Sequence, residues 1–229
     1  MKRLMAILLA ALLLTMPLFA SADTFSTEHA TAYLESKFQC GCTRGGVGAM
    51  IGRYGLITAA HNLYCHTHAQ GLSYCNFYFG ARTAGSCWYQ YSGKFTYTVY
   101  NTFSNGYNSN DDIGYVIFDS PVGNTTGWFG YLVGDDSDLH YEYMHMMYFN
   151  TYRHSREEFT IMQVYNDKQV YWEGRNYNYG GGPVFLWYEG MDFPRVVAVY
   201  TSDNSDGYSF GRRLTSDIIR DMRMDGAFD

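Results

Sequence analysis

The feature that most constrains this chain is a succession of short β-rich runs separated by turn clusters. Ser104-Asn105-Gly106 and Asn204-Ser205-Asp206-Gly207 are two such clusters. Aromatic residues make up 18% of the chain, with 23 Tyr and only 4 Pro, which favours strands over helices. Many short strands are typical of an antiparallel sandwich or barrel. The runs that we expect to be strands are Gly48–Gly52, Gly55–Thr58, Phe77–Phe79, Thr96–Tyr100, Ile113–Phe118, Tyr141–Phe149, Phe159–Tyr165, Val184–Trp187 and Arg195–Thr201.

Two segments carry helical signals instead. The segment Thr27–Lys37 follows Ser26 and has apolar residues at helical spacing, namely Ala30, Tyr33, Leu34 and Phe38. Near the end of the chain, Ser216 and Asp217 can cap a helix with Ile218, Ile219 and Met222 on one face. We therefore expect a short helix near each end of a β domain.

The N-terminus has the pattern of a secretory signal peptide. Lys2 and Arg3 precede the apolar stretch Met5–Phe19, and Ala20-Ser21-Ala22 is a small-residue cleavage site. We expect residues 1–22 to be removed and the protein to be extracellular or periplasmic. An uncleaved anchor is the alternative, disfavoured by the short apolar stretch. No later run is long enough to span a membrane, so we expect no membrane association of the mature form.

The charge balance excludes some classes of partner. The chain has 22 acidic and 16 basic residues, a formal net charge of -6. A mildly acidic surface argues against nucleic acid or anionic lipid as the main partner. Its 229 residues are 47% hydrophobic and contain no long polar linker, so one large domain or two packed small ones are expected.

All five cysteines lie in the first half of the mature chain, at positions 40, 42, 65, 75 and 87. An exported protein is expected to form disulfides, and an odd number leaves one thiol over; the sequence alone does not choose the pairs. Zinc bound by Cys65-His66-Thr67-His68 and Cys75 is the alternative. Its spacing matches no standard ligand pattern, so we expect no metal and no other cofactor. Met144-His145-Met146-Met147 is interpreted as a core strand rather than a soft-metal site.

Three stretches carry possible catalytic chemistry, in a fixed order along the chain. Gly55–His61 is a strand running into a small-residue turn that ends on His61. Asp112 directly precedes a hydrophobic strand, and Tyr179–Phe185 is a glycine loop that opens another strand. Serine proteases need a His as general base, an Asp to orient it, and a Ser on a glycine turn whose amides bind the oxyanion.

These motifs resemble the bacterial glutamyl endopeptidase branch of the chymotrypsin-like (trypsin-like) serine proteases, over about residues 45–222. The stretches that carry the resemblance are Ile57-Thr-Ala-Ala-His61, Asp112-Ile-Gly114, Ser120-Pro-Val-Gly-Asn-Thr-Thr-Gly-Trp-Phe-Gly130, Gly181-Gly-Pro-Val-Phe185 and Ala198-Val-Tyr-Thr201.

The resemblance implies an all-β fold of two six-stranded antiparallel Greek-key barrels with a C-terminal helix. It implies a protease-like domain over residues 23–222 and a tail over 223–229. Barrel one is expected at about 39–119 and barrel two at about 131–212, with the site between them. Because the segment before Cys40 has helical spacing, we expect the first strand of the family to be absent.

Carried over from the family, His61 is the general base and Asp112 its orienting acid, while the neighbouring Asp111 is a turn residue. The nucleophile position holds Gly180, which has no side chain. The oxyanion hole is assigned to Asn178 and Gly180, although Asn178 stands where the family has Gly. Several departures around one loop indicate drift or a new use of the loop.

The specificity residues also depart from the family. Tyr200 replaces the His that recognises the substrate carboxylate, so a preference for Glu is not implied. Arg175 is in the segment that lines the substrate pocket; it is either a pocket residue or a solvated surface arginine. The family bridge that closes the His loop implies pairing of Cys42 with Cys65, then Cys75 with Cys87, leaving Cys40.

Two hypotheses follow. The first is a secreted, monomeric protease homologue that has lost hydrolysis and binds a peptide or protein in the cleft between the barrels. The alternative is an active serine endopeptidase whose recorded sequence is altered at the nucleophile or that uses another group.

Overall fold

The structure is a computed structural model. It describes residues 25–81, 83, 85–105, 109–149, 154–160, 163–166, 168–174 and 179–229. The predicted signal peptide over residues 1–22, Arg175 and Asn178 lie outside the described residues.

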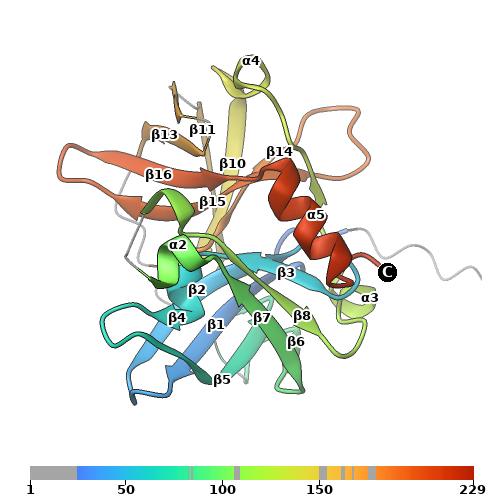
Figure 1. The fold of residues 1–229 in the computed structure, drawn as a ribbon. Coiled ribbons are helices and arrows are strands. Elements are labelled where there is room, and N and C mark those ends of the chain that lie inside the picture. The colour runs from blue at the N-terminus through green and yellow to red at the C-terminus, as the bar shows by residue number, and fades with distance from the viewer. Residues whose placement is uncertain are drawn as a thin grey trace, which may run out of the picture.

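Two sheets make up most of the structure (Figure 1). The strands of the first sheet are β1 (Thr31–Phe38), β2 (Thr43–Met50), β3 (Gly55–Thr58), β4 (Tyr64–Cys65), β5 (Gln70–Phe79), β6 (Tyr89–Tyr91), β7 (Phe95–Val99) and β8 (Gly114–Phe118). The strands of the second are β9 (Gly130–Tyr131), β10 (Tyr143–Phe149), β11 (His154–Thr160), β12 (Gln163–Asn166), β13 (Gln169–Glu173), β14 (Pro183–Leu186), β15 (Arg195–Asp203) and β16 (Tyr208–Arg213).

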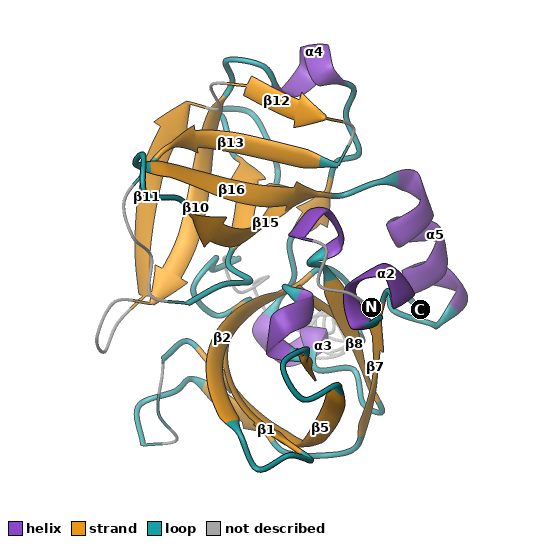
Figure 2. Ribbon diagram, turned by 60° about the vertical axis from the view of Figure 1, so that its left-hand side comes forward, coloured by secondary structure: helices purple, strands orange, loops and turns teal. Residues whose placement is uncertain are grey.

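The pairing within each sheet is antiparallel, except that β9 runs parallel to β15. The first sheet has the order β4-β5-β1-β2-β3-β8-β7, with β6 on β5, and curls around its own core (Figure 2). The second has the order β11-β10-β14-β15-β16-β13-β12. The expected all-β double barrel is therefore confirmed, with short additional strands that bring each sheet to eight strands within the described residues.

Short helices lie at the connections, and one longer helix ends the fold. They are η1 (Ala60–Asn62), α2 (Asn101–Ser104), η2 (Ser109–Asp111), α3 (Gly123–Thr126), α4 (Asp136–Leu139) and α5 (Ser216–Met224). The predicted C-terminal helix is confirmed as α5, with Thr215 as its N-cap residue. No helix in the described part of the chain is long and apolar enough to cross a membrane.

The predicted helix at Thr27–Lys37 is wrong. After a turn at Thr27–Ala30, β1 occupies Thr31–Phe38 and pairs with both β2 and β5. The side chains of Ala32, Leu34, Ser36 and Phe38 are buried, while Glu35 and Lys37 are exposed. This alternation has period two, and the helical spacing was a coincidence of apolar residues on both faces of the strand. The first sheet therefore begins near residue 31 rather than 39, and the family's first strand is present.

The last residues do not form a free tail. Ala227 is fully buried, and its carbonyl oxygen accepts a hydrogen bond from the Tyr54 amide at 3.1 Å. A Cβ on Gly55 would lie 2.5 Å from the Ala227 Cβ, so glycine at position 55 makes room for this contact. The end of the chain is thereby fixed against the β2–β3 turn.

Three apolar clusters hold the fold together. One fills the first barrel, around Leu34, Phe77 and Phe118, and another fills the second, around Trp172 and Val184. The third lies between the sheets and includes Ile57, Phe129 and Phe185 together with Ile218 and Met222 of α5. The strand β10 contributes buried Met144, His145, Met146 and Met147, so the core interpretation of this segment is confirmed.

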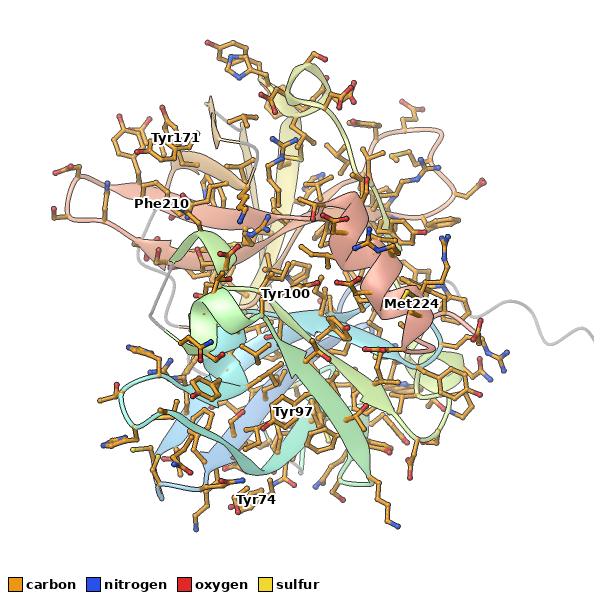
Figure 3. All side chains as sticks on the ribbon, viewed as in Figure 1. Tyr74, Tyr97, Tyr100, Tyr171, Phe210 and Met224 are labelled. Carbon is orange, nitrogen blue, oxygen red and sulfur yellow. The ribbon has the colours of Figure 1, made fainter. Side chains whose placement is uncertain are left out.

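Some aromatic residues outside these clusters pack against residues of neighbouring elements. Tyr171 of β13 packs on Phe210 of β16 with ring centroids 6.0 Å apart, and on Tyr208 at 5.6 Å (Figure 3). Tyr100 lies where the first sheet approaches α5, and its hydroxyl donates to Asp221 at 3.3 Å (Figure 3). Cross-strand aromatic pairs of this kind stabilise sheets, which explains part of the unusual tyrosine content.

Candidate active site

His61 and Asp112 meet where two neighbouring strands end and begin. η1, which carries His61, follows β3, while Asp112 and Ile113 precede β8. β3 and β8 are antiparallel partners with Thr58 opposite Gly114, so the end of one strand lies beside the start of the other. The motifs at residues 61 and 112 are therefore brought together by strand pairing.

The geometry of this pair fixes the orientation of the imidazole. His61 Nδ1 lies 2.7 Å from Asp112 Oδ2, and the His61 backbone amide donates to Asp112 Oδ1 at 2.9 Å. Asp112 is only 1% exposed. With the Nδ1 proton donated to this carboxylate, Nε2 is the nitrogen available to accept a proton.

The adjacent Asp111 faces elsewhere. Its Oδ1 lies 2.9 Å from Lys168 Nζ and 3.8 Å from Arg212 Nη2, both from the second sheet region. Burial raises the pKa of Asp111, but the Lys168 hydrogen bond and the nearby positive charges outweigh burial and lower it overall. The structure thus pairs His61 with Asp112 and places Asp111 in an ion pair between the two barrels.

The glycine loop is held by hydrogen bonds to both barrels. The Gly180 carbonyl oxygen accepts from the Val47 amide of the first sheet at 2.9 Å. On the second-barrel side, the Gly181 amide donates to the Tyr200 carbonyl oxygen at 2.6 Å, and the Tyr200 amide donates to the Gly182 carbonyl oxygen at 2.8 Å. Gly181 has a φ of +94°, a left-handed conformation that favours glycine.

Gly180 lies directly in front of the imidazole. A Cβ placed on Gly180 would fall well inside van der Waals contact of His61 Nε2 and Cε1. Position 180 is therefore the point on the glycine loop that faces the proton-accepting nitrogen. A hydroxyl on this residue would be in reach of His61, and glycine supplies none.

The comparisons with solved structures find the same architecture. The structure of a Glu endopeptidase in complex with MPD has a TM-score of 0.73 at 13% identity, covering 90% of this chain and 94% of that one. The protease Anisep from Arthrobacter nicotinovorans has a TM-score of 0.67 at 13% identity, covering 89% and 98%. This chain has the chymotrypsin-like serine protease fold. A serine protease of a human pathogenic astrovirus is more distant in shape, with a TM-score of 0.53 at 16% identity over 83% and 92%.

These similarities are structural. The sequence matches no protein-family model and none of the curated proteins with which it was compared. At these identities the likeness establishes the fold of the chain, and the chemistry has to be argued from its own residues.

Asn62 is a site residue that the motif analysis did not identify. Within the chymotrypsin-like fold its side-chain amide donates to the Gly180 carbonyl oxygen at 2.9 Å and to Thr58 Oγ1 at 3.0 Å. The backbone carbonyl oxygen of Asn62 accepts from Ser36 Oγ at 2.7 Å. Asn62 is fully buried and links the His61 segment to the glycine loop. Its position directly after His61 is the one sequence signal that could have pointed to it.

Tyr200 belongs to the second-barrel core. It is 3% exposed and packs near Trp172, with ring centroids 6.3 Å apart. Its backbone anchors the glycine loop, as described above. A role for Tyr200 in a substrate pocket stays a prediction, as do those of Arg175 and Asn178, which lie outside the described residues.

None of the five cysteines, all of which the structure describes, is in a disulfide, so the expected Cys42–Cys65 and Cys75–Cys87 bridges are not formed there. Cys75 lies on the buried face of β5, with its sulfur 3.5 Å from Ser36 Oγ, and burial raises the pKa of its thiol to about 12. Cys42 and Cys65 instead share a cluster with Cys40 and His68.

The thiols in this cluster influence one another. The backbone amide of Cys42 lowers the pKa of Cys40, whereas the neighbouring Cys40 thiol raises the pKa of Cys42. The fourth member, His68, is exposed, and Cys65 is buried. The zinc alternative had named Cys75 together with residues 65–68, but Cys75 is not a member of the cluster.

Proposed function

We propose that this protein is a secreted serine-protease homologue that does not hydrolyse peptides efficiently and instead binds a peptide or protein segment between its two barrels. The observation that carries the proposal is Gly180, which faces His61 Nε2 without a hydroxyl. Loss of one triad member leaves about 10³–10⁴-fold catalysis over water in the enzymes where this has been measured. The secreted location is proposed from the N-terminal sequence pattern.

The edge of β15 beside Gly180 supports peptide binding. β14 pairs with β15 as far as Val199, whereas β16 pairs with the other side of β15 as far as Asp203. Beyond Tyr200, therefore, the β14 side of β15 has no neighbouring strand in the part of the chain that the structure describes. A Cβ on Gly180 would lie 3.4 Å from the Thr201 carbonyl oxygen, so this edge adjoins the His61 site. An extended peptide can add to such an edge through backbone hydrogen bonds.

The second candidate function is an active endopeptidase. The His61–Asp112 pair and the anchored glycine loop favour it, because both keep the geometry that proton transfer needs. Hydrolysis by this route uses a water in place of the missing hydroxyl, or a nucleophile from elsewhere in the chain.

One experiment separates the two. The mature protein is immobilised, and binding peptides are selected from a phage-displayed random peptide library. The selected peptide is then incubated with the protein, and its integrity and the hydrogen exchange of the protein are followed by mass spectrometry. We expect an intact peptide and slower exchange at Thr201 and Ser202.

Rapid cleavage of the peptide contradicts the loss of hydrolysis and supports the second candidate. Failure to select any peptide, or protection confined to another face, contradicts binding between the barrels. The relevant other face is the hollow of about 880 Å³ on the first barrel, lined by residues that include Tyr74, Phe95 and Asp119.

A further inference from the structure

Two hairpin turns of the first barrel bring four metal-binding side chains together. Cys40 and Cys42 lie in the turn between β1 and β2, and Cys65 and His68 lie at the turn between β4 and β5. β5 pairs with both β1 and β4, which places the two turns at the same end of the sheet. The Gln39 amide donates to the Gly71 carbonyl oxygen at 3.0 Å, a direct bond between the two turn regions.

Each turn has a backbone shape that aligns its pair of side chains. In the first turn, the Gly41 amide donates to the Phe38 carbonyl oxygen at 2.9 Å, and the Phe38 amide donates to the Cys42 carbonyl oxygen at 2.9 Å. Gly41 has a φ of +86°. In the second, the His68 amide donates to the Cys65 carbonyl oxygen at 3.2 Å, and Ala69 has a φ of +52°. Left-handed residues of this kind close tight turns, so the two sulfurs in one turn and the sulfur and imidazole in the other face the same space.

The distances match tetrahedral coordination. The four donor atoms, three Sγ and one imidazole nitrogen, all lie within 4.8 Å of one another. His68 Nδ1 is 3.5 Å from Cys42 Sγ and 3.4 Å from Cys65 Sγ. In a tetrahedral zinc site with Zn–S of about 2.3 Å, sulfur ligands are separated by about 3.8 Å, and sulfur and nitrogen by about 3.5 Å. The two nitrogen–sulfur distances therefore match this spacing, and the remaining donor atoms lie within about 1 Å of it.

We propose that Cys40, Cys42, Cys65 and His68 form a structural Cys3His site for a zinc ion. Three thiolates and one imidazole are the donor set of a closed tetrahedral zinc site, and they disfavour hard cations such as Mg²⁺ or Ca²⁺. Binding displaces the thiol protons to solvent, and no oxidation is involved. This replaces the earlier expectation of a disulfide and no metal at this end of the barrel.

The donor set also argues against a simple disulfide. A Cys42–Cys65 bridge would use two of the sulfurs, leaving Cys40 and His68 beside it with no role. A metal ion uses all four groups. It would join the β1–β2 turn to the segment that follows His61, since Cys65 is close to His61 in the chain and Arg44 donates to the His61 carbonyl oxygen at 3.1 Å. The site would thus hold the His61 segment in place from outside the barrel.

The test measures bound metal directly. The mature full-length protein is purified with added zinc under mild reducing conditions, dialysed, and analysed by elemental mass spectrometry. We expect about one zinc ion per chain. In the protein freed of metal with a chelator, Co²⁺ titration should give the visible absorption bands of a tetrahedral cobalt–thiolate complex.

Matched variants assign the ligands. Cys42→Ser and His68→Ala should weaken zinc affinity by more than about 100-fold, the upper range for loss of an outer-shell partner alone. Cys87→Ser and His66→Ala, which change a cysteine and a histidine outside the cluster, should leave the stoichiometry unchanged. The cobalt spectrum of the wild type decides the matter even if a ligand variant fails to fold.

Three results would overturn the proposal. One is a wild-type protein that binds neither zinc nor cobalt at micromolar concentrations while its thiols are reduced. Another is peptide mapping without reductant that finds Cys42 and Cys65 joined in protein prepared with zinc present. A Cys42→Ser variant that binds zinc as tightly as the wild type would assign the metal to other residues and equally refute the site.

Discussion

The chemistry of the candidate site depends on a few residues that the fold holds rigidly. Asp112 binds both the backbone and the ring of His61, and Asn62 and Val47 hold the Gly180 carbonyl oxygen. At position 180 the loop approaches His61 closely, and the residue there is a glycine without a side chain. Under the proposed function, His61 and Asp112 would be a base and its orienting acid, with no nucleophile on the loop.

Restoring the hydroxyl at position 180 tests this account of the loop. Gly180 does not have a left-handed φ, unlike Gly181, so Ser meets no backbone strain there. Its Cβ would, however, crowd the His61 ring, which has to move while remaining bound to Asp112. We expect weak peptidase activity from Gly180→Ser, measured with a fluorogenic peptide library, and about 10²–10³ more turnover when Asn178→Gly is added.

The matched control is Gly180→Ala, which brings the same Cβ without the hydroxyl and should show no activity. In the Gly180→Ser background, Asp112→Asn should lower turnover by about 10⁴ because the imidazole loses its orienting partner. If Gly180→Ala is as active as Gly180→Ser, the hydroxyl is not the reacting group and this interpretation is incorrect.

Asn62 should contribute to stability as well as to loop position. Asn62→Ala removes two hydrogen bonds, one to the Gly180 carbonyl oxygen and one to Thr58 Oγ1. The Gly180 carbonyl oxygen still accepts from the Val47 amide, so the cost is that of two lost bonds at about 0.5–1.5 kcal/mol each, and the free energy of unfolding in urea should fall by about 1–3 kcal/mol. Asn76→Ala, which removes an exposed hydrogen bond to Glu35, should change it much less. Equal effects of the two variants would contradict the linking role of Asn62.

At the scale of elements, sequence patterns predicted the strands that alternate clearly or are fully buried. The segments at Gly55–Thr58, Ile113–Phe118 and Arg195–Thr201 lie on β3, β8 and β15, and they also carry or flank the site. The predicted strand Phe159–Tyr165 is instead divided between the end of β11 and the start of β12. The helix prediction for the β1 segment was wrong because apolar residues on both faces of this strand mimic helical spacing.

Contacts between segments that are distant in the sequence could not be predicted from local sequence patterns. The resemblance to chymotrypsin-like proteases implied that His61, Asp112 and the residue 180 loop meet, and pairing of β3 with β8 brings His61 and Asp112 together. The cluster of Cys40, Cys42, Cys65 and His68 depends on two turns lying at one end of a sheet, and their spacing along the chain does not reveal that. The link through Asn62 also had no motif, since its partners are backbone groups far away in the sequence.

The ion pair of Asp111 connects the η2 element to the second barrel and should be visible in acid stability. Because the folded state lowers the pKa of Asp111, its contribution is present above the unfolded value of about 4 and is lost as pH falls through the folded value. Asp111→Asn should reduce the free energy of unfolding by about 1–2 kcal/mol at pH 7. This is less than the loss of one partner from a fully buried ion pair would cost, because Lys168 is 45% exposed.

The measurement is urea unfolding of both proteins from pH 7 down to pH 2. The difference between wild type and Asp111→Asn should shrink below about pH 4. Asp192→Asn, at an exposed position, serves as the control and should show little difference at any pH. A difference that stays constant down to pH 2 would mean that the carboxylate charge is not what stabilises this contact.

At the scale of the whole molecule, the two barrels and α5 form one frame around the candidate site. The apolar cluster between the sheets joins residues of both barrels to α5, and the end of the chain packs on the β2–β3 turn. This frame keeps the His61 segment and the glycine loop in register without any contribution from a nucleophile. The contacts that hold this frame together do not depend on a side chain at position 180, and the proposed zinc site would strengthen the same frame at one end of the first barrel.

The most direct test of the central claim is labelling of the mature wild-type protein with a fluorophosphonate probe, which reacts with activated serine nucleophiles. The probe is added at neutral pH with an active serine protease as a positive control in a parallel tube, and adducts are located by peptide mass spectrometry. The account predicts labelling of the control protease and no adduct on any residue of this protein. An adduct on any residue of the wild-type chain would contradict it.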